Sequence, residues 1–135
     1  MKEINSFFQR DRFAAHNDIT LVEVRPGYAR TEMEISEKHL NGVNITHGGA
    51  IFTLADFAFA VASNSHGTVA VGINASISFL QASRRGRLTA IANEIHRNAK
   101  MATYQVEVRN HKDELLATFT GTVFRKDYPL SEVMD

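Results

Sequence analysis

The chain has 135 residues, of which 44% are apolar and 22% are charged, as expected for one soluble globular domain. Its 15 basic and 15 acidic residues balance to a formal net charge of zero, so no basic excess points to a nucleic acid partner. Because the chain has no cysteine, disulfides, cysteine zinc sites and a cysteine nucleophile are excluded.

The first residues predict a short amphipathic helix over residues 4–15. Its large apolar residues can share one side of that helix, and they are Ile4, Phe7, Phe8 and Phe13. The stretch MKEINSFFQRDRF is charged throughout and lacks the apolar core of a signal peptide. We therefore expect a cytoplasmic protein.

Two strands follow this helix. Residues 19–25 are rich in β-branched side chains, and PGY at residues 26–28 is a turn signal. Residues 28–35 then alternate between apolar and polar side chains, which is typical of a strand with one buried face. These patterns predict a hairpin over residues 19–35.

A long apolar helix is predicted over residues 48–64, after a polar connection over residues 36–47. Gly67 is placed to cap its C-terminus. The apolar run within it, residues 50–62, is too short to cross a membrane and contains Asp56, so we expect no membrane partner. A buried carboxylate costs several kcal/mol unless it is paired, so Asp56 requires an explanation.

The rest of the chain predicts four strands and a loose tail. The strands cover residues 68–80, 87–97, 101–109 and 115–125, and the tail covers residues 127–135. Short turns imply antiparallel pairing, and a helix that is apolar nearly all round must be covered on most sides. We predict one α+β domain, residues 1–135, with a curved antiparallel sheet wrapped around the long helix and a second subunit on the remaining side.

The stretch HGGAIFTLAD, followed by FAFAVASNS, closely resembles the hotdog-fold acyl-CoA thioesterases of the phenylacetate-degradation (PaaI-like) type. The segments ISFL, GRLTA and YQVEV fall in the family's order, so the likeness covers roughly residues 15–125. The resemblance implies the hotdog fold, a curved antiparallel β-sheet around one central α-helix. It also implies hydrolysis of an acyl-CoA without cofactor or metal, by a homodimer that often pairs into a homotetramer.

The resemblance assigns roles to residues of the motif. Asp56 matches the acidic residue taken as general base or nucleophile, and Gly48 matches the glycine whose N–H polarises the thioester carbonyl. His47 and Gly49 belong to the same motif, and Asn41 matches an asparagine that places the carbonyl or the water. Each of these residues also has a structural alternative. Asp56 could be a buried carboxylate that caps a backbone group, His47 could fix the turn by hydrogen bonding, and Asn41 could be a turn residue.

Helix geometry agrees with these roles. A helix N-terminus presents unpaired N–H groups and a partial positive charge, and glycine lets a substrate approach closely. Asp56 lies eight residues after Gly48, about 12 Å along the helix axis. Because both cannot touch one thioester carbon, the spacing requires an antiparallel second chain that brings its Asp56 to this Gly48.

Two further segments are expected to bind substrate. The first segment is the arginine-rich turn around Gly86. Guanidinium groups suit phosphate oxygens, so we expect this turn to be a clamp for the coenzyme A phosphates; the alternative is a solvated hairpin tip without a ligand. Its members are Arg84, Arg85 and Arg87, joined by Lys100 at the next turn. The family commonly has a proline and a glycine in this loop, whereas this chain has QASRRGR. A polar residue after the helix, Asn74 or Ser76 with Ser78 as a third candidate, is expected to hold the catalytic water.

Two other functions are alternatives. A non-catalytic acyl-CoA binding module would use the same pocket, although a sensor needs no base at Asp56. A hotdog hydratase or dehydratase needs a histidine and an acid that move a proton at carbon, and that pattern is absent. The resemblance suggests an aromatic, phenylacetyl-type or medium-chain acyl group. An acyl carrier protein as donor and an anhydride mechanism stay open.

Overall fold

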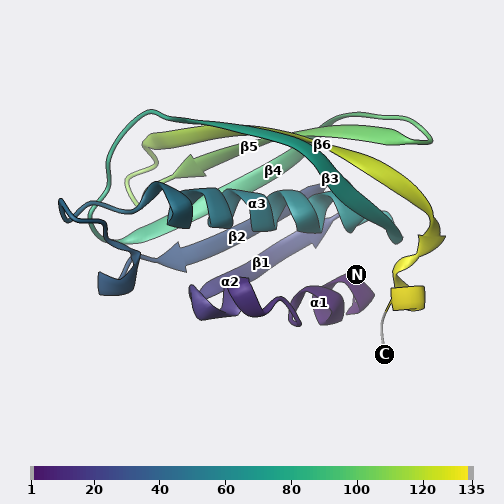
Figure 1. The fold of residues 1–135 in the computed structure, drawn as a ribbon, viewed down its shortest axis with the longest axis horizontal. Helices are drawn as coiled ribbons and strands as arrows, with labels where there is room; N and C mark the ends of the chain where they lie inside the picture. Colours follow the sequence, from purple (N-terminus) through teal and green to yellow (C-terminus); the bar gives the residue numbers. More distant parts are fainter. Residues whose placement is uncertain (1, 134–135) are drawn as a thin grey trace.

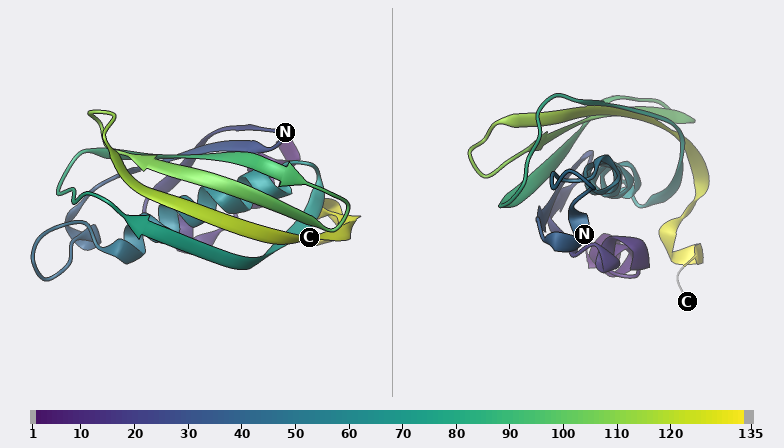
Figure 2. Two further views of the ribbon diagram at one scale, coloured as in Figure 1. Left: turned by 90° about the horizontal axis from the view of Figure 1, so that it is seen from above. Right: turned by 60° about the vertical axis from the view of Figure 1, so that its left-hand side comes forward.

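A curved sheet around one long helix dominates the structure, a computed structural model that describes residues 2–133 (Figure 1). The central helix α3 (Gly48–Asn64) lies in the concave side of the sheet. Two short helices, α1 (Lys2–Phe8) and α2 (Arg12–His16), lie on the side of α3 that faces away from the sheet (Figure 2). This is the α+β arrangement predicted from the sequence.

The sheet has six antiparallel strands. They are β1 (Ile19–Arg25), β2 (Tyr28–Glu34), β3 (Thr68–Phe79), β4 (Arg87–Arg97), β5 (Met101–Arg109) and β6 (Leu115–Pro129). Their order across the sheet is β1-β2-β4-β5-β6-β3, so β1 and β3 are its two edges. The predicted hairpin is confirmed by the pairing of β1 with β2.

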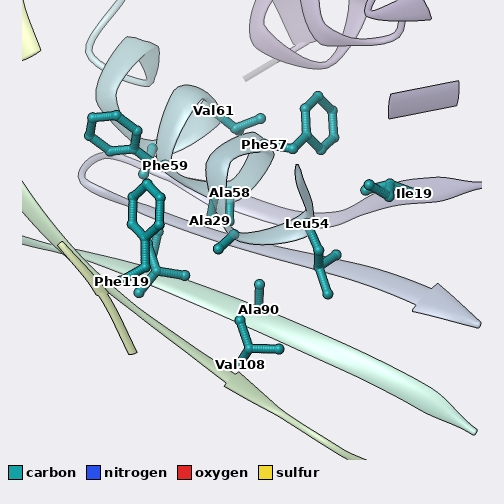
Figure 3. Close-up of a cluster of buried hydrophobic side chains, with 14 of the residues drawn as sticks. Ile19, Ala29, Leu54, Phe57, Ala58, Phe59, Val61, Ala90, Val108 and Phe119 are labelled. Atoms are coloured by element: carbon teal, nitrogen blue, oxygen red, sulfur yellow. The ribbon is translucent and has the colours of Figure 1, made fainter. Parts of the chain in front are cut away.

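The bounds of α3 match the prediction over residues 48–64. The helix begins after the N-cap residue His47, and after it ends Gly67 adopts a φ of 92°, which favours glycine. Most of the helix is buried, and Phe59 packs against Phe119 of β6 with ring centroids 5.5 Å apart (Figure 3). The long apolar run is therefore explained by burial beneath the sheet.

The N-terminal segment forms two helices, so the prediction of one helix over residues 4–15 is wrong. Asp11 begins the second helix, and its Oδ1 accepts a hydrogen bond from the N–H of Ala14 at 2.9 Å. Aspartate favours this N-cap position because it satisfies a donor that the helix leaves unpaired. The break leaves Phe13 66% exposed, whereas Ile4 and Phe8 are buried.

The C-terminal segment is more ordered than predicted. Strand β6 continues to Pro129, and a short 3-10 helix follows at Leu130–Val133. A second 3-10 helix of the described chain lies before α3, at Glu37–His39. The side chain of Leu130 is buried in the core, and its N–H donates to the carbonyl of Gly67 at 3.0 Å. A loose tail over residues 127–135 is therefore wrong up to residue 133, and residues 134 and 135 lie outside the described residues.

Candidate active site

The N-terminus of α3 carries a free backbone donor. The Nδ1 of His47 accepts a hydrogen bond from the N–H of Gly49 at 2.8 Å, which places the ring hydrogen on Nε2. The N–H of Gly48, the first helical residue, has no hydrogen-bond partner among residues 2–133. His47 thus fixes the turn, and the turn leaves the Gly48 N–H available to a ligand.

Asn41 organises the loop in front of this helix end. Its Oδ1 accepts hydrogen bonds from the N–H groups of Val43 at 3.0 Å and Ile45 at 3.3 Å. Its Nδ2 makes no hydrogen bond within the described part of the chain. The side chain can therefore hold the loop through its oxygen and still donate to a ligand through its nitrogen.

A groove of about 350 Å³ joins Asn41 to Gly48. It is lined by Asn41, Ile45, Thr46, Gly48, Ile51, Phe79, Leu80, Gln81 and Ala82. The ring of Phe79 covers Gly48 so closely that a Cβ on this residue would lie 3.1 Å from it. Any group that reaches the Gly48 N–H therefore lies next to an apolar wall supplied by β3.

Asp56 lies two turns further along α3, about 12 Å from Gly48 along the axis. Its carboxylate is exposed in the single chain and makes no hydrogen bond or ion pair with the described residues. A structural capping role is therefore wrong. Although solvent reaches the side chain, desolvation by the surrounding protein raises its pKa, and the negative charge of Asp11 raises it further.

One stripe of α3 is only partly covered by the rest of the chain, although its Phe52 still meets Phe119 of β6 with ring centroids 5.5 Å apart. Its members are exposed or half-buried, and they are Gly49, Phe52, Thr53, Asp56 and Ala60. They recur at the spacing of one helix face, so Asp56 lies in the middle of an otherwise uncharged surface. The sequence predicted this uncovered side.

The arginine loop between β3 and β4 is held against the start of α3. The carbonyl of Ser83 accepts hydrogen bonds from the N–H and the Oγ1 of Thr46, each at 2.8 Å. Arg84 and Arg85 line an adjacent groove of about 370 Å³ together with Lys112. Lys112 was not among the predicted cations, because only the fold brings the β5–β6 turn to this loop.

Arg87 and Lys100 do not join this group. Arg87 lies 4.0 Å from a carboxylate oxygen of Glu32 and lines a separate groove that also holds Glu34 and Asp113. Lys100 follows the far end of β4, about 33 Å from Arg87 along that strand. Within one chain, the predicted clamp of four cations is therefore wrong.

The polar residues of β3 face away from α3. Asn74 is opposite Thr122, whose Oγ1 contacts Thr103 at 3.0 Å on the outer face of the sheet, and Ser76 is opposite Thr120. Gly72 faces the helix, since a Cβ there would lie 3.3 Å from Phe59. A bulge between Gly72 and Asn74 adds one residue to β3, so the side chains after it point to the opposite face of the sheet from the one that the sequence alternation would give. Within one chain, Asn74, Ser76 and Ser78 therefore cannot hold a water at the face that carries Asp56.

Neither a metal centre nor a membrane helix is found in the described chain. Among residues 2–133, no group of three or more His, Asp or Glu side chains is arranged to hold a metal ion. None of the helices in this range has the length and apolar character to cross a membrane.

Comparison with known proteins identifies the family. The family model of the thioesterase superfamily matches residues 43–117. A protein of Archaeoglobus fulgidus is 43% identical over 125 residues, which are 90% of this chain and 81% of that protein. The acyl-coenzyme A thioesterase PaaI of Escherichia coli is 34% identical over 122 residues, 90% of this chain and 87% of that protein.

Solved structures show the same fold. The Escherichia coli PaaI protein from the phenylacetic acid degradation operon superimposes with a TM-score of 0.91 at 32% identity, over 95% of this chain and 94% of that one. A mutant of the phenylacetic acid degradation protein PaaI from Thermus thermophilus superimposes with a TM-score of 0.82 at 36% identity. This match covers 86% of this chain and 100% of that one.

The chain belongs to the thioesterase superfamily, and its fold is the hotdog fold. Within that family it is a PaaI-like enzyme of the thioester hydrolase class.

Proposed function

We propose that this enzyme hydrolyses an acyl-CoA to a free acid and coenzyme A, with water as the attacking group. The observation that carries the proposal is the free N–H of Gly48 at a helix N-terminus, with an unpaired carboxylate, Asp56, on the same helix. The PaaI relative that covers most of the chain is named for this activity. The Gly48 N–H polarises the thioester carbonyl and stabilises the oxyanion that forms from it.

Asp56 supplies the base. A raised pKa makes its carboxylate a stronger base than an aspartate of ordinary pKa. It takes a proton from water as the water oxygen bonds to the carbonyl carbon. The tetrahedral intermediate then collapses, the carbon–sulfur bond breaks, and the thiolate of coenzyme A takes up a proton. Asn41 donates from its free Nδ2 to the same carbonyl or to the water.

We further propose that the active unit is at least a homodimer with shared sites. Among residues 2–133, no strand pairs with the outer side of edge strand β3, and its large apolar residues are exposed: Val71 is 46%, Ile73 55% and Phe79 53% exposed. Such an edge favours pairing with another strand. An antiparallel second copy across β3 and the uncovered stripe of α3 would bring its Asp56 to this Gly48. Two such dimers would form the homotetramer.

The arginine loop is suited to the nucleotide of coenzyme A. Arg84, Arg85 and Lys112 surround one groove, and the loop is fixed to the start of α3 through Ser83 and Thr46. Guanidinium groups bind phosphate oxygens in pairs, so this groove would hold the phosphates while the thioester reaches Gly48. We propose an aromatic, phenylacetyl-type acyl group, in line with the phenylacetic acid degradation operon named for one relative, or alternatively a medium-chain acyl group.

The test is thiol release from a panel of acyl-CoAs, measured with a thiol-reactive dye. The absence of cysteine keeps the protein's own signal low. We expect the wild type to hydrolyse at least one member and Asp56→Asn to lose about 10²–10⁴ of kcat. Asp127→Asn, the same change at an exposed aspartate outside the site, should retain full activity.

The outcome also separates the alternatives. Hydration of an enoyl-CoA without thiol release would indicate a hydratase. Acyl-CoA that raises the melting temperature without being hydrolysed would indicate a binding module. Either result would contradict the proposal, as would an Asp56→Asn variant with unchanged kcat.

A further inference from the structure

A buried histidine lies behind the turn that carries the Gly48 donor. His39 is only 1% exposed, although its imidazole is polar, and the mechanism proposed above gives it no role. It is the last residue of the 3-10 helix Glu37–His39. Its backbone carbonyl accepts a hydrogen bond from the N–H of His47 at 2.7 Å. His39 is therefore in direct contact with the residue that precedes Gly48.

Both ring nitrogens of His39 have fixed partners. Nδ1 accepts a hydrogen bond from the N–H of Ser36 at 2.9 Å, so the ring hydrogen is on Nε2, which donates to the carbonyl of Asn17 at 2.9 Å. The bond to Ser36 stays within one turn, whereas Asn17 is 22 residues away in the sequence, at the C-terminal end of α2. The ring therefore joins the loop before α3 to the junction between α2 and β1.

The direction of the Gly48 N–H follows from these links. This N–H shares one planar peptide with the carbonyl of His47, which accepts hydrogen bonds from the N–H groups of Ala50 at 2.9 Å and Ile51 at 3.3 Å. The N–H of His47, on its other side, is held by His39. The helix and the loop thus fix the peptide from two sides, so a displacement of His39 would tilt the Gly48 N–H.

An ion pair runs beside the imidazole link. The Nζ of Lys38 lies 2.6 Å from a carboxylate oxygen of Asp18, so it joins the same two segments. Its two side chains are 47% and 65% exposed, and ion pairs at such exposure hold little because water and salt screen them. The buried bond from His39 to Asn17 is therefore the stronger connection between the loop and α2.

We propose that His39 is a positioning residue for the oxyanion donor: its Nε2–H bond to Asn17 holds the loop so that the Gly48 N–H points at the thioester carbonyl. The inference rests on the proposed thioesterase function. An oxyanion donor is effective only at hydrogen-bond distance from the position that the oxyanion will take. Because a misplacement of about 1 Å can cost about 10²-fold in rate, a loosened loop lowers kcat.

Two substitutions separate the two hydrogen bonds of the ring. His39→Asn places an oxygen near the position of Nδ1, where it accepts from Ser36, but its side chain is too short to reach Asn17. His39→Gln places an amide nitrogen near the position of Nε2, where it donates to Asn17. We expect His39→Asn to lower kcat about 10- to 100-fold with KM changed less than about twofold, and His39→Gln to retain kcat within about threefold.

Tyr104→Phe is the control for a loss of stability alone. The hydroxyl of Tyr104 donates to Glu94 at 2.8 Å, and Glu94 also contacts His66, just beyond the C-terminal end of α3. We expect this variant to have a lower melting temperature and unchanged kcat. Amide exchange measured by NMR gives a readout that does not need activity. The His47 amide should exchange faster in His39→Asn than in the wild type, His39→Gln or Tyr104→Phe.

Several outcomes would overturn the proposal. An unchanged kcat in folded His39→Asn, with only a lower melting temperature, would mean that His39 stabilises the fold and does not position the donor. An equal loss of kcat in both His39 variants would exclude the bond to Asn17 as the cause. If His39→Asn does not fold, a loss of about tenfold or more in folded His39→Gln overturns the proposal by itself. A wild type that hydrolyses no thioester would remove the proposed function, whereas exchange at His47 would still show whether His39 fixes the turn.

Discussion

Asp11 caps α2 through its Oδ1 and at the same time acts through its charge on Asp56 of α3. Desolvation and this charge both raise the pKa of Asp56 above 3.8, so the base is lost to protonation at a higher pH than for an ordinary aspartate. We expect kcat/KM to fall on the acid side with an apparent pKa above 3.8. In Asp11→Asn the fall in kcat/KM on the acid side should move to lower pH, because the charge that raises the pKa of Asp56 is gone.

The measurement is the pH profile of kcat/KM for both proteins and for Asp127→Asn, whose profile should match the wild type. A profile that is identical in Asp11→Asn and the wild type would show that Asp11 has no effect on the base. A loss of activity at every pH would point instead to a disturbed α2.

Gly48 allows its N–H to be removed without breaking the helix. It is the first helical residue, where proline is favoured, and His47 before it is extended with ψ of 135°, as proline requires. We expect Gly48→Pro to lower kcat by about 10²–10³, the usual effect of losing one oxyanion donor. Gly48→Ala is the matched control, since it adds a similar Cβ near Phe79 but keeps the N–H.

Kinetics of the two variants at saturating acyl-CoA measure the difference. If Gly48→Ala loses as much kcat as Gly48→Pro, crowding against Phe79 and not the missing donor is responsible. Circular dichroism checks that both variants keep their helix.

Shared sites predict that two inactive variants restore each other. Asp56→Asn and Gly48→Pro subunits, unfolded together and refolded, should regain about a quarter of wild-type activity, because half of the dimers are mixed and one of their two sites is intact. The assay is thiol release from the mixture and from each variant refolded alone. Activity no higher than that of the separate variants would mean that each site is built within one chain.

The arginine loop should affect binding of the nucleotide and not the chemical step. Replacing Arg84 and Arg85 together by glutamine should raise KM for an acyl-CoA about three- to tenfold with kcat unchanged, because exposed charge pairs are worth about 1 kcal/mol or less each. The thioester of N-acetylcysteamine, which lacks phosphates, should show no change. Arg87→Gln is the control, since Arg87 pairs with Glu32 in another groove. An equal rise in KM for both thioesters would contradict the clamp.

The sequence predicted the elements whose burial follows one periodicity. Residues 48–64 are apolar on most sides and are flanked by capping residues, so the predicted bounds of α3 match the observed ones. Alternation on β2 and β5 predicted which face is buried, and residues such as Ala29 and Tyr104 have no exposed surface. The uncovered side of α3 also followed, since a carboxylate there needs solvent or a partner.

The features that the sequence did not predict depend on single residues or on contacts between distant parts of the chain. The side chain of Asp11 ends one helix and begins another, which apolar spacing does not reveal. One extra residue in β3 moves Asn74 and Ser76 to the outer face, because a shift of one position reverses every side chain that follows. Lys112 reaches the arginine loop only through the packing of two turns.

The open edge of β3 makes that strand a reporter of association. Ala70 donates its N–H to Oδ1 of Asn64, but the other amides on the outer side of β3 lack a strand partner among the described residues. In an isolated chain these amides exchange with deuterium freely, whereas pairing with a second copy would protect them. Amides between β5 and β6 stay paired in either state. Dilution of the protein should therefore raise deuterium uptake in β3 selectively, which gives the dissociation constant without attaching a probe to the protein.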